Sequence, residues 1–376
     1  SAASDVYKRQ VTYPLLLSFA FTLTATSCLQ AAWQNNTVLI QKEGNSTVVK
    51  HPGDNKTLFK NTDSQLAIEW GLKTVTHTVI LGGEYVISDR IDIPRPGVTL
   101  IVDQHATLRL NPDSAHTTID FKSRNAGYWQ MLPMIYNRGH DDVQILMFGT
   151  LQKWKIENKD NGKQTLPIMF DGRNEKGNCG LSGGVMIVTG HATDSFWLVD
   201  SARVHVPIVA LDTNPGASLV LEGCEDCHLG LIASISPNKG GNTAETIDLN
   251  SRNIDITIER LVGERSQEII DCNESHVIVE DVISVGSPRK MFGRGPVSGP
   301  RYTNRRSFGS RSLDVRNTTV LENAVESRLI HEVPQLPDAL PAFTVQTTVE
   351  ITLPDNRKKH YIRKAAFDLR HQTTSE

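Results

Sequence analysis

The sequence has little of what marks several large classes of protein. Its 376 residues include five cysteines and carry a formal net charge of −3 at pH 7, and aromatic residues make up 6%. A nucleic-acid-binding protein usually presents a strongly basic face, so this balance argues against nucleic acid as a partner. A structural zinc site needs two ligand pairs, and Cys224-Glu225-Asp226-Cys227 has no evident second pair.

The chain also lacks a run long enough for a confident membrane span. The apolar run at residues 14–23, PLLLSFAFTL, is short and interrupted by Ser and Thr. Lys8 and Arg9 precede it and small residues follow, ending at Ala31-Ala32, which predicts a secretory signal cleaved near Ala32. The first ten residues, SAASDVYKRQ, resemble a translated library adaptor. We therefore expect residues 1–32 to be an adaptor-like tail plus a signal peptide, and the protein to be secreted or periplasmic.

In an oxidising compartment the cysteines can pair. Cys224 could close a small loop with Cys227, or one of them could pair with Cys179. Cys272 lies at a position that we expect to face the core.

What the sequence does contain is a repeat. The stretch ETIDLN, which begins at Glu245, returns 23 residues later as EIIDCN, which begins at Glu268. Such a period, carried by β-branched residues, is typical of one coil of a parallel β-solenoid. Equivalent positions on neighbouring coils would then lie about 4.8 Å apart. A third coil places Lys290 after Glu245 and Glu268, so this charge column is the predicted centre of function.

Short strand patterns extend the repeat over most of the chain. Alternating apolar residues predict strands at residues 142–145, 203–206, 228–231, 255–258 and 276–279. We expect a polar lead-in at residues 33–62, a β-solenoid domain at residues 63–325 with a polar, glycine-rich insertion at residues 153–184, and a C-terminal cap at residues 326–376.

The start of the repeat carries a resemblance to a known family. Residues 64–72 have helical apolar spacing behind Asp63 or Asn61 as the N-cap. They are followed by Gly82-Gly83-Glu84-Tyr85 and then by Pro96-Gly97-Val98-Thr99-Leu100. This order resembles the opening of right-handed parallel β-helix proteins of the pectate-lyase-like superfamily, over about residues 63–325. The resemblance implies an all-β, right-handed parallel β-helix whose N-terminal helix caps the exposed end of the first coil.

Two chemistries of that superfamily have partial counterparts among the motifs of this sequence. Asn242-Thr243-Ala244-Glu245 and Gln267-Glu268 resemble polygalacturonase motifs, although the histidine element is replaced by Ser287-Pro288-Arg289-Lys290. Hydrolysis needs two carboxylates, which Glu245 and Glu268 could supply. The second chemistry is β-elimination on a uronate, which needs a base and a cation to neutralise the carboxylate.

The cations near the column favour β-elimination. Their arrangement resembles that of β-helix alginate and pectate lyases, which implies Lys290, Arg265, Glu268 and Glu245 as catalytic residues. Substrate-binding roles would then fall to Lys239, Arg289, Arg294, His205, Tyr128 and Trp129. A bound Ca²⁺ could hold the carboxylate in place of a second cation, and the sequence leaves this open.

Structural interpretations stand beside these functional ones. The charge column could be a solvent-facing ion-pair ladder worth under ~1 kcal/mol. Asp248 stacked on Asp271, and Asn250 on Asn273, could cap turns at solenoid corners. His205 could be a surface residue, and Tyr128 and Trp129 could pack on the solenoid.

We expect a monomeric, secreted polysaccharide lyase that cleaves an acidic polyuronate such as alginate or pectate. The alternatives are a polygalacturonase-like hydrolase and a non-catalytic carbohydrate-binding or adhesive protein.

Overall fold

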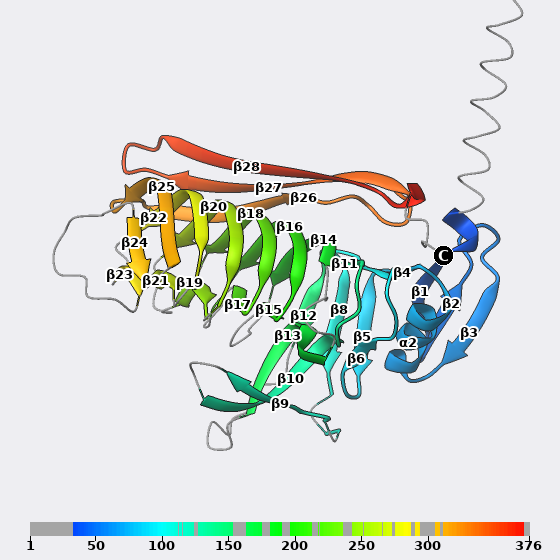
Figure 1. Ribbon diagram of the computed structural model, residues 1–376. Coiled ribbons are helices and arrows are strands. Elements are labelled where there is room, and N and C mark those ends of the chain that lie inside the picture. Colours follow the sequence, from blue (N-terminus) through cyan, green and yellow to red (C-terminus); the bar gives the residue numbers. More distant parts are fainter. Residues whose placement is uncertain are drawn as a thin grey trace, which may run out of the picture.

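The fold is built almost entirely from strands. The computed structural model describes residues 33–371 apart from 112, 115, 124–126, 153–162, 175–180, 190–195, 213–216, 218, 236–242, 251, 265, 273–274, 287–289, 294–304 and 309–310. Two large sheets, A and B, and a three-stranded C-terminal sheet account for the strands (Figure 1). The expected all-β class with mainly parallel sheets is confirmed.

Sheet A is parallel except at its two ends. Its strands in spatial order are β24 (Arg305–Phe308), β25 (Arg311–Leu321), β22 (Val277–Val285), β20 (Ile254–Glu264), β18 (Glu225–Ile235), β16 (Ala202–Asp212), β14 (Leu181–Thr189), β11 (Val143–Met147), β7 (Thr99–Val102), β4 (His77–Ile80), β1 (Thr37–Glu43), β2 (Ser46–Lys50) and β3 (Thr57–Asn61). The strands β5 (Gly83–Ile87), β8 (Ala106–Leu110) and β12 (Thr150–Gln152) join it through β14.

Sheet B runs beside sheet A. Its order is β23 (Lys290–Gly293), β21 (Ser266–Cys272), β19 (Thr243–Leu249), β17 (Leu219–Glu222), β15 (Phe196–Val199), β13 (Lys163–Asp171), β10 (Gly127–Asn137) and β6 (Ile91–Ile93), with β9 (Ile119–Ser123) antiparallel to β10. From β13 to β23 the chain alternates strand by strand between the two sheets.

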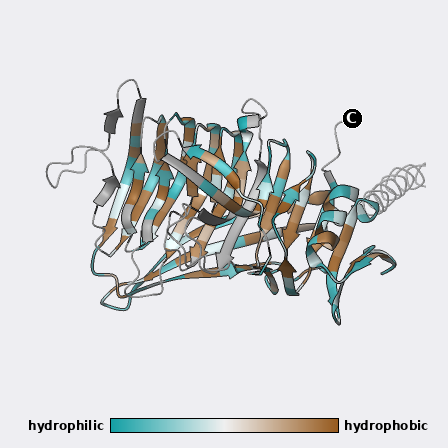
Figure 2. Ribbon diagram, turned by 90° about the horizontal axis from the view of Figure 1, so that it is seen from below, coloured by the Kyte–Doolittle hydropathy of each residue, from teal (hydrophilic) through white to brown (hydrophobic). Residues whose placement is uncertain are grey.

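The core lies between the sheets and consists of columns of apolar residues. In sheet B one column pairs neighbours in register, and every member is buried: Ile135, Ile168, Phe196, Leu219, Ile247 and Ile270. Figure 2 shows apolar and polar residues alternating along the strands. This alternation is what a sheet with one buried face requires. Cys272 joins this core as expected.

The long strands of sheet A bend in the middle. In β16 the interior residues are Val204, Val206, Val209 and Leu211, so the usual spacing of two is broken once by a spacing of three. Residues before and after this break therefore project toward different outer faces of the molecule. Ile208 and Ala210, after the break, contact the C-terminal sheet rather than the interior.

The N-terminal end differs from the expected lead-in. Residues 37–61 form β1, β2 and β3, of which β1 pairs in parallel with β4. The reason is burial, because Val38, Ile40 and Val49 fill the first layer of the core. The predicted helix is confirmed as α2 (Ser64–Thr74).

Helix α2 packs on the strands from β1 to β6. Asp63 is its N-cap, and its carboxylate accepts hydrogen bonds from the backbone N–H groups of Gln65 and Leu66 at 2.8 and 3.4 Å. Ile68 and Leu72 enter the core. A side chain at Gly71 would come within 3.0 Å of Thr78, so the helix lies unusually close to β4.

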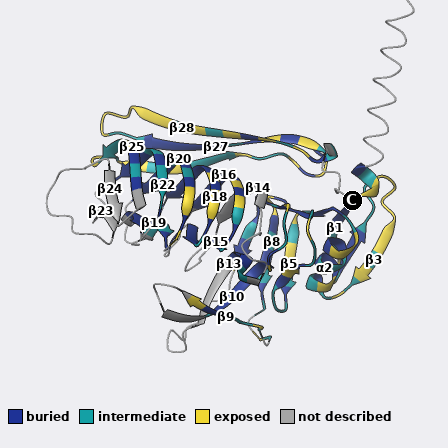
Figure 3. Ribbon diagram, viewed as in Figure 1, coloured by how far each residue is buried: buried dark blue, intermediate teal, exposed yellow. Residues whose placement is uncertain are grey.

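The C-terminal segment is not an end cap. The strands β26 (Glu326–Glu332), β27 (Ala342–Thr352) and β28 (Lys358–Asp368) form an antiparallel sheet that lies lengthwise over the outer side of sheet A (Figure 1). Two apolar clusters join them, one with Phe343 and Val345 and one with Val349 and Ile351. Figure 3 shows β27 mainly buried and β28 alternating between exposed and covered residues.

The expected insertion at residues 153–184 contains strands of the two large sheets. All of β13 and the start of β14 fall within it; β13 belongs to sheet B and β14 to sheet A. The described part of the chain contains no helix that is both long and apolar enough to cross a membrane. Cys224, Cys227 and Cys272 are free thiols, and Cys179 lies outside the described residues.

Candidate functional site

The predicted charge column has the register that the repeat implied. Glu245 on β19 pairs with Glu268 on β21, which pairs with Lys290 on β23. Glu245 is half-buried, whereas only the backbone is described at Glu268 and Lys290. Four further predicted residues lie outside the described residues: Lys239, Arg265, Arg289 and Arg294.

The acidic pair next to the column is not at a turn. Asp248 and Asp271 lie within β19 and β21 and pair in register, so they do not cap corners as we expected. The corner role belongs to Asn253, which accepts a hydrogen bond from Cys224 N at 3.0 Å and donates to Leu221 O at 3.1 Å.

A bend in β19 separates the column from this acidic pair. Thr246 and Ile247 are consecutive and both fully buried, as are Ile269 and Ile270 in β21. Two consecutive interior residues break the alternation, so Glu245 projects toward a different outer face from Asp248.

Three other predicted residues lie elsewhere. His205 is exposed on β16 of sheet A, and is therefore not part of the sheet B column. Tyr128 and Trp129 lie on β10, where the backbone alone is described.

The strongest candidate site among the described residues is one that the sequence did not indicate. A pocket of about 440 Å³ opens where β6, β10 and β13 of sheet B meet the segment 117–120. We call it the arginine pocket, because Arg90, Arg138 and Arg173 line it together with Asp120, Tyr136 and Asp171.

Asp171 organises the floor of the arginine pocket. Its carboxylate is fully buried and accepts two hydrogen bonds from the Arg173 guanidinium, from Nε at 2.7 Å and from Nη2 at 2.6 Å. It also accepts the hydroxyl of Tyr136 at 3.0 Å. Bidentate pairing of this kind fixes orientation as well as charge. Burial, reinforced by the charge of Asp171, raises the pKa of Tyr136, so the phenol stays protonated at neutral pH.

Cation–π contacts hold two of the arginines against aromatic rings. The Arg90 guanidinium lies 4.9 Å from the centre of the Tyr136 ring and pairs with Asp92 at 2.7 Å. The Arg173 guanidinium lies 4.7 Å from the centre of the Phe121 ring. Both guanidiniums are therefore fixed and already neutralised by carboxylates.

Arg138 differs from the other two. It is exposed, and it forms no hydrogen bond or ion pair with any other described residue. Asp120, which also lines the pocket, is exposed as well, and from the described residues it accepts only a long contact of 3.5 Å from Gln130 Nε2. The fixed pairs thus leave one cation and one carboxylate available to a ligand.

This arrangement can bind an anion and move protons. An unpaired guanidinium binds a carboxylate through two parallel hydrogen bonds. An exposed carboxylate can accept a proton, and a protonated phenol can donate one.

The chain offers one signal that could have found this site. Tyr136-Asn137-Arg138-Gly139 and Phe170-Asp171-Gly172-Arg173 each place an arginine close to a glycine just after an apolar strand. Their strands pair in register, with Asn137 opposite Phe170, so the two strand ends lie side by side.

No group of three or more His, Cys, Asp or Glu side chains within the described ranges is arranged to hold a metal ion. Comparison of the chain with models of protein families, with curated proteins and with solved structures finds no match.

Proposed function

We propose that the chain is a right-handed parallel β-helix of the pectate-lyase-like kind, exported from the cytoplasm, that acts on an acidic polysaccharide. The strand-by-strand alternation between two parallel sheets, the in-register columns and the helix α2 at the first coils support the β-helix. The predicted signal segment supports export.

The observation that carries the proposal is the state of Arg138. It lies exposed at a pocket whose other two arginines are fixed by carboxylates, so it is the guanidinium available to a uronate carboxylate. The pocket is open and lined mainly by polar groups, as a segment of a hydrated polymer requires.

The proposed reaction is β-elimination. Arg138 neutralises the uronate carboxylate, and Asp120 accepts the proton from C5. The electron pair of that C–H bond forms the C4–C5 double bond as the C4–O bond breaks. The leaving oxygen takes the proton of Tyr136, whose phenol stays protonated at neutral pH because burial raises its pKa.

The charge column is the rival centre for the same reaction. Lys290 would then be the base, with Glu245 and Glu268 beside it. In sheet B, β23 is the sixth strand along from β10. At the usual spacing between neighbouring strands, the distance between β10 and β23 is roughly 29 Å. The two centres therefore cannot act on one bond, and variants distinguish them.

The test is incubation with alginate, pectate and polygalacturonate, followed by ultraviolet absorbance of the unsaturated product and by reducing ends. A lyase gives both signals, a hydrolase gives reducing ends alone, and a non-catalytic binder gives neither. Arg138→Ala should abolish both signals. The control is Arg357→Ala, an exposed arginine between β27 and β28 that pairs only with Asp355 among the described residues. Unchanged cleavage by Arg138→Ala would refute the assignment to the arginine pocket.

A further inference from the structure

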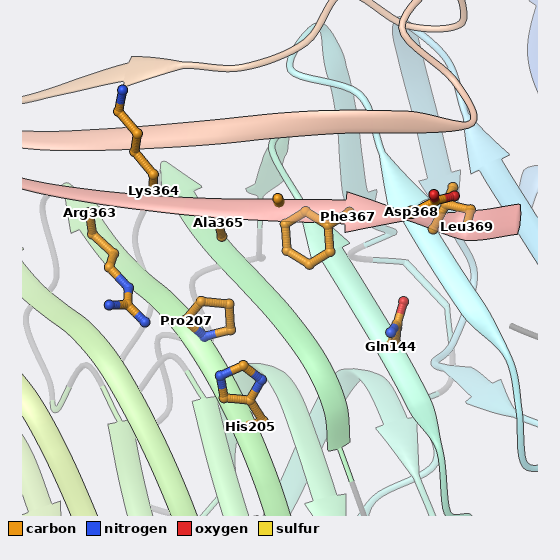
Figure 4. A pocket seen from close by; sticks show the side chains of 10 residues that line it. Gln144, His205, Pro207, Arg363, Lys364, Ala365, Phe367, Asp368 and Leu369 are labelled. Carbon is orange, nitrogen blue, oxygen red and sulfur yellow. The ribbon is translucent and has the colours of Figure 1, made fainter. Parts of the chain in front are cut away.

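A second pocket, of about 330 Å³, lies between the C-terminal sheet and sheet A. Arg363 and Phe367 project into it from β28, and His205 and Gln144 face them from β16 and β11 (Figure 4). Lys364 points to the opposite side of β28. We call this the β28 pocket. It belongs to sheet A and is thus separate from the arginine pocket on sheet B.

Its polar side chains have hydrogen-bonding capacity that the described protein does not use. A guanidinium has five N–H donors. For Arg363 the described residues supply one acceptor, Glu259. Gln144 Oε1 is buried without a partner among the described residues, and the imidazole ring of His205 forms no hydrogen bond with any of them. Buried polar atoms are nearly always satisfied, so these unused groups at one pocket can serve a polar ligand.

The local contacts fix these groups in place. Glu259 bridges the Arg363 guanidinium and His228 Nε2, the latter at 2.8 Å, and the rings of His228 and His205 lie 5.5 Å apart. A side chain at residue 230 would meet Pro207 O at 2.2 Å and Arg363 Nε at 3.0 Å. Gly230 therefore provides the room in which Arg363 crosses from β28 to sheet A.

Part of the lining is apolar. Pro207, Phe367 and Leu369 cover the space between the cationic end at Arg363 and the amide of Gln144. The carboxylate of Asp368 does not oppose an anion there, because it pairs with Arg370 at 2.7 Å.

We propose that the β28 pocket is a second binding site, for a short carboxylate-bearing sugar. Arg363 and His205 would hold the carboxylate, the ring of Phe367 would pack against the apolar face of the sugar, and the Gln144 amide would donate to and accept from its hydroxyls. A few polar groups placed around an apolar wall are what small-ligand sites generally present. The proposal concerns binding alone and does not depend on cleavage at the arginine pocket.

The test is isothermal titration calorimetry with trigalacturonate, with neutral maltotriose as the ligand control. It uses the full chain carrying Arg138→Ala, so that the arginine pocket does not contribute. We expect this protein to bind trigalacturonate and not maltotriose. Adding His205→Ala, Gln144→Leu or Arg363→Gln should each weaken binding roughly tenfold or more.

His205→Ala keeps the test independent of folding, because this side chain is exposed and its removal leaves no hydrogen bond broken among the described residues. Thermal unfolding of each variant checks that the C-terminal sheet remains docked. Absence of binding in the Arg138→Ala protein, or binding that His205→Ala and Gln144→Leu leave unchanged, would overturn the proposal. Neither result bears on whether Arg138 supports cleavage, which the product assays measure separately.

Discussion

Tyr136 donates its hydroxyl to Oδ2 of Asp171 at 3.0 Å, from the strand next to the one that carries the carboxylate. The same oxygen accepts Arg173 Nη2, so Asp171 joins a proton donor to a cation in the floor of the arginine pocket. Removing the charge of Asp171 should therefore affect both the Tyr136 hydroxyl and the Arg173 guanidinium.

We expect Asp171→Asn to lower the free energy of unfolding by about 2 to 3 kcal/mol, because it leaves the largely buried Arg173 without its counter-charge. Urea denaturation measures this. The chain supplies a matched control in Asp355→Asn, since Asp355 pairs with Arg357 in the same Asp-x-Arg spacing but in an exposed turn. That change should have no measurable effect on stability. Equal effects would show that burial does not strengthen the Asp171 pair.

The register of sheet B predicts a large effect at Ile270. This side chain is fully buried between Ile247 and the next coil, so Ile270→Ala should cost about 2 to 4 kcal/mol by leaving a cavity. The control is Ile362→Ala on β28, where the side chain is 50% exposed. Denaturant melts of both variants give the comparison, and a cost at Ile362 as large as at Ile270 would contradict the register.

The two candidate centres make opposite predictions for catalysis. If the arginine pocket is the centre, Arg138→Ala abolishes the unsaturated product and Lys290→Ala retains it. If the charge column is the centre, Lys290→Ala abolishes the product while polymer binding and folding persist. We expect the first result, since the arginine pocket alone brings an available cation, a carboxylate and a protonated phenol together among the described side chains. Ultraviolet product assays on each polyuronate decide between them.

His331 predicts a pH dependence of stability. Burial lowers the pKa of His331 from 6.5 to about 4, while its Nδ1 lies 3.0 Å from Thr347 Oγ1. Below pH 6.5 the unfolded chain binds a proton that the native imidazole does not, so stability should fall as pH decreases from 6.5 toward 4. The loss should reach ~3 kcal/mol at most.

Unfolding measured between pH 7 and 4.5 on the native protein and on His331→Gln gives this contribution as a difference, because His205, whose pKa is also lowered by burial, acts equally in both. Hydrogen bonds from Lys358 and His360 lower the pKa of Glu350 from 4.5 to about 2, so its own contribution is lost only below that window. His331→Gln keeps a hydrogen-bonding group and should flatten the profile. A profile identical to that of the native protein would assign the dependence to other groups.

The sequence predicts the part of the fold where coils have constant length. Asp248 and Asp271 pair 23 residues apart, and the repeat between them is visible by inspection. Tyr136 and Met169 occupy the same column of sheet B but pair 33 residues apart, because more residues separate these two strands. No fixed period connects them, which is why the arginine pocket was missed.

Two segments differ from the prediction, and they do so for related physical reasons. Residues 37–50 contain the apolar positions of β1 and β2, yet each strand is short and followed by polar residues, so the alternation is weak. The C-terminal strands form an antiparallel sheet of their own. Their place along sheet A depends on which apolar faces remain uncovered, which only the packed coils determine.

The position of the C-terminal sheet over sheet A affects how the protein folds. The apolar clusters that include the C-terminal sheet also include residues from Trp33 to Val285, so the outer face of sheet A stays uncovered until the last strands have been made. Coils that pair with their sequence neighbours can form as synthesis proceeds, whereas this closing contact spans nearly the whole chain. Long-range contacts slow folding and leave apolar surface open to association. We therefore expect removal of residues 326–376 to yield a chain with formed coils that self-associates, which light scattering and far-ultraviolet circular dichroism together would reveal.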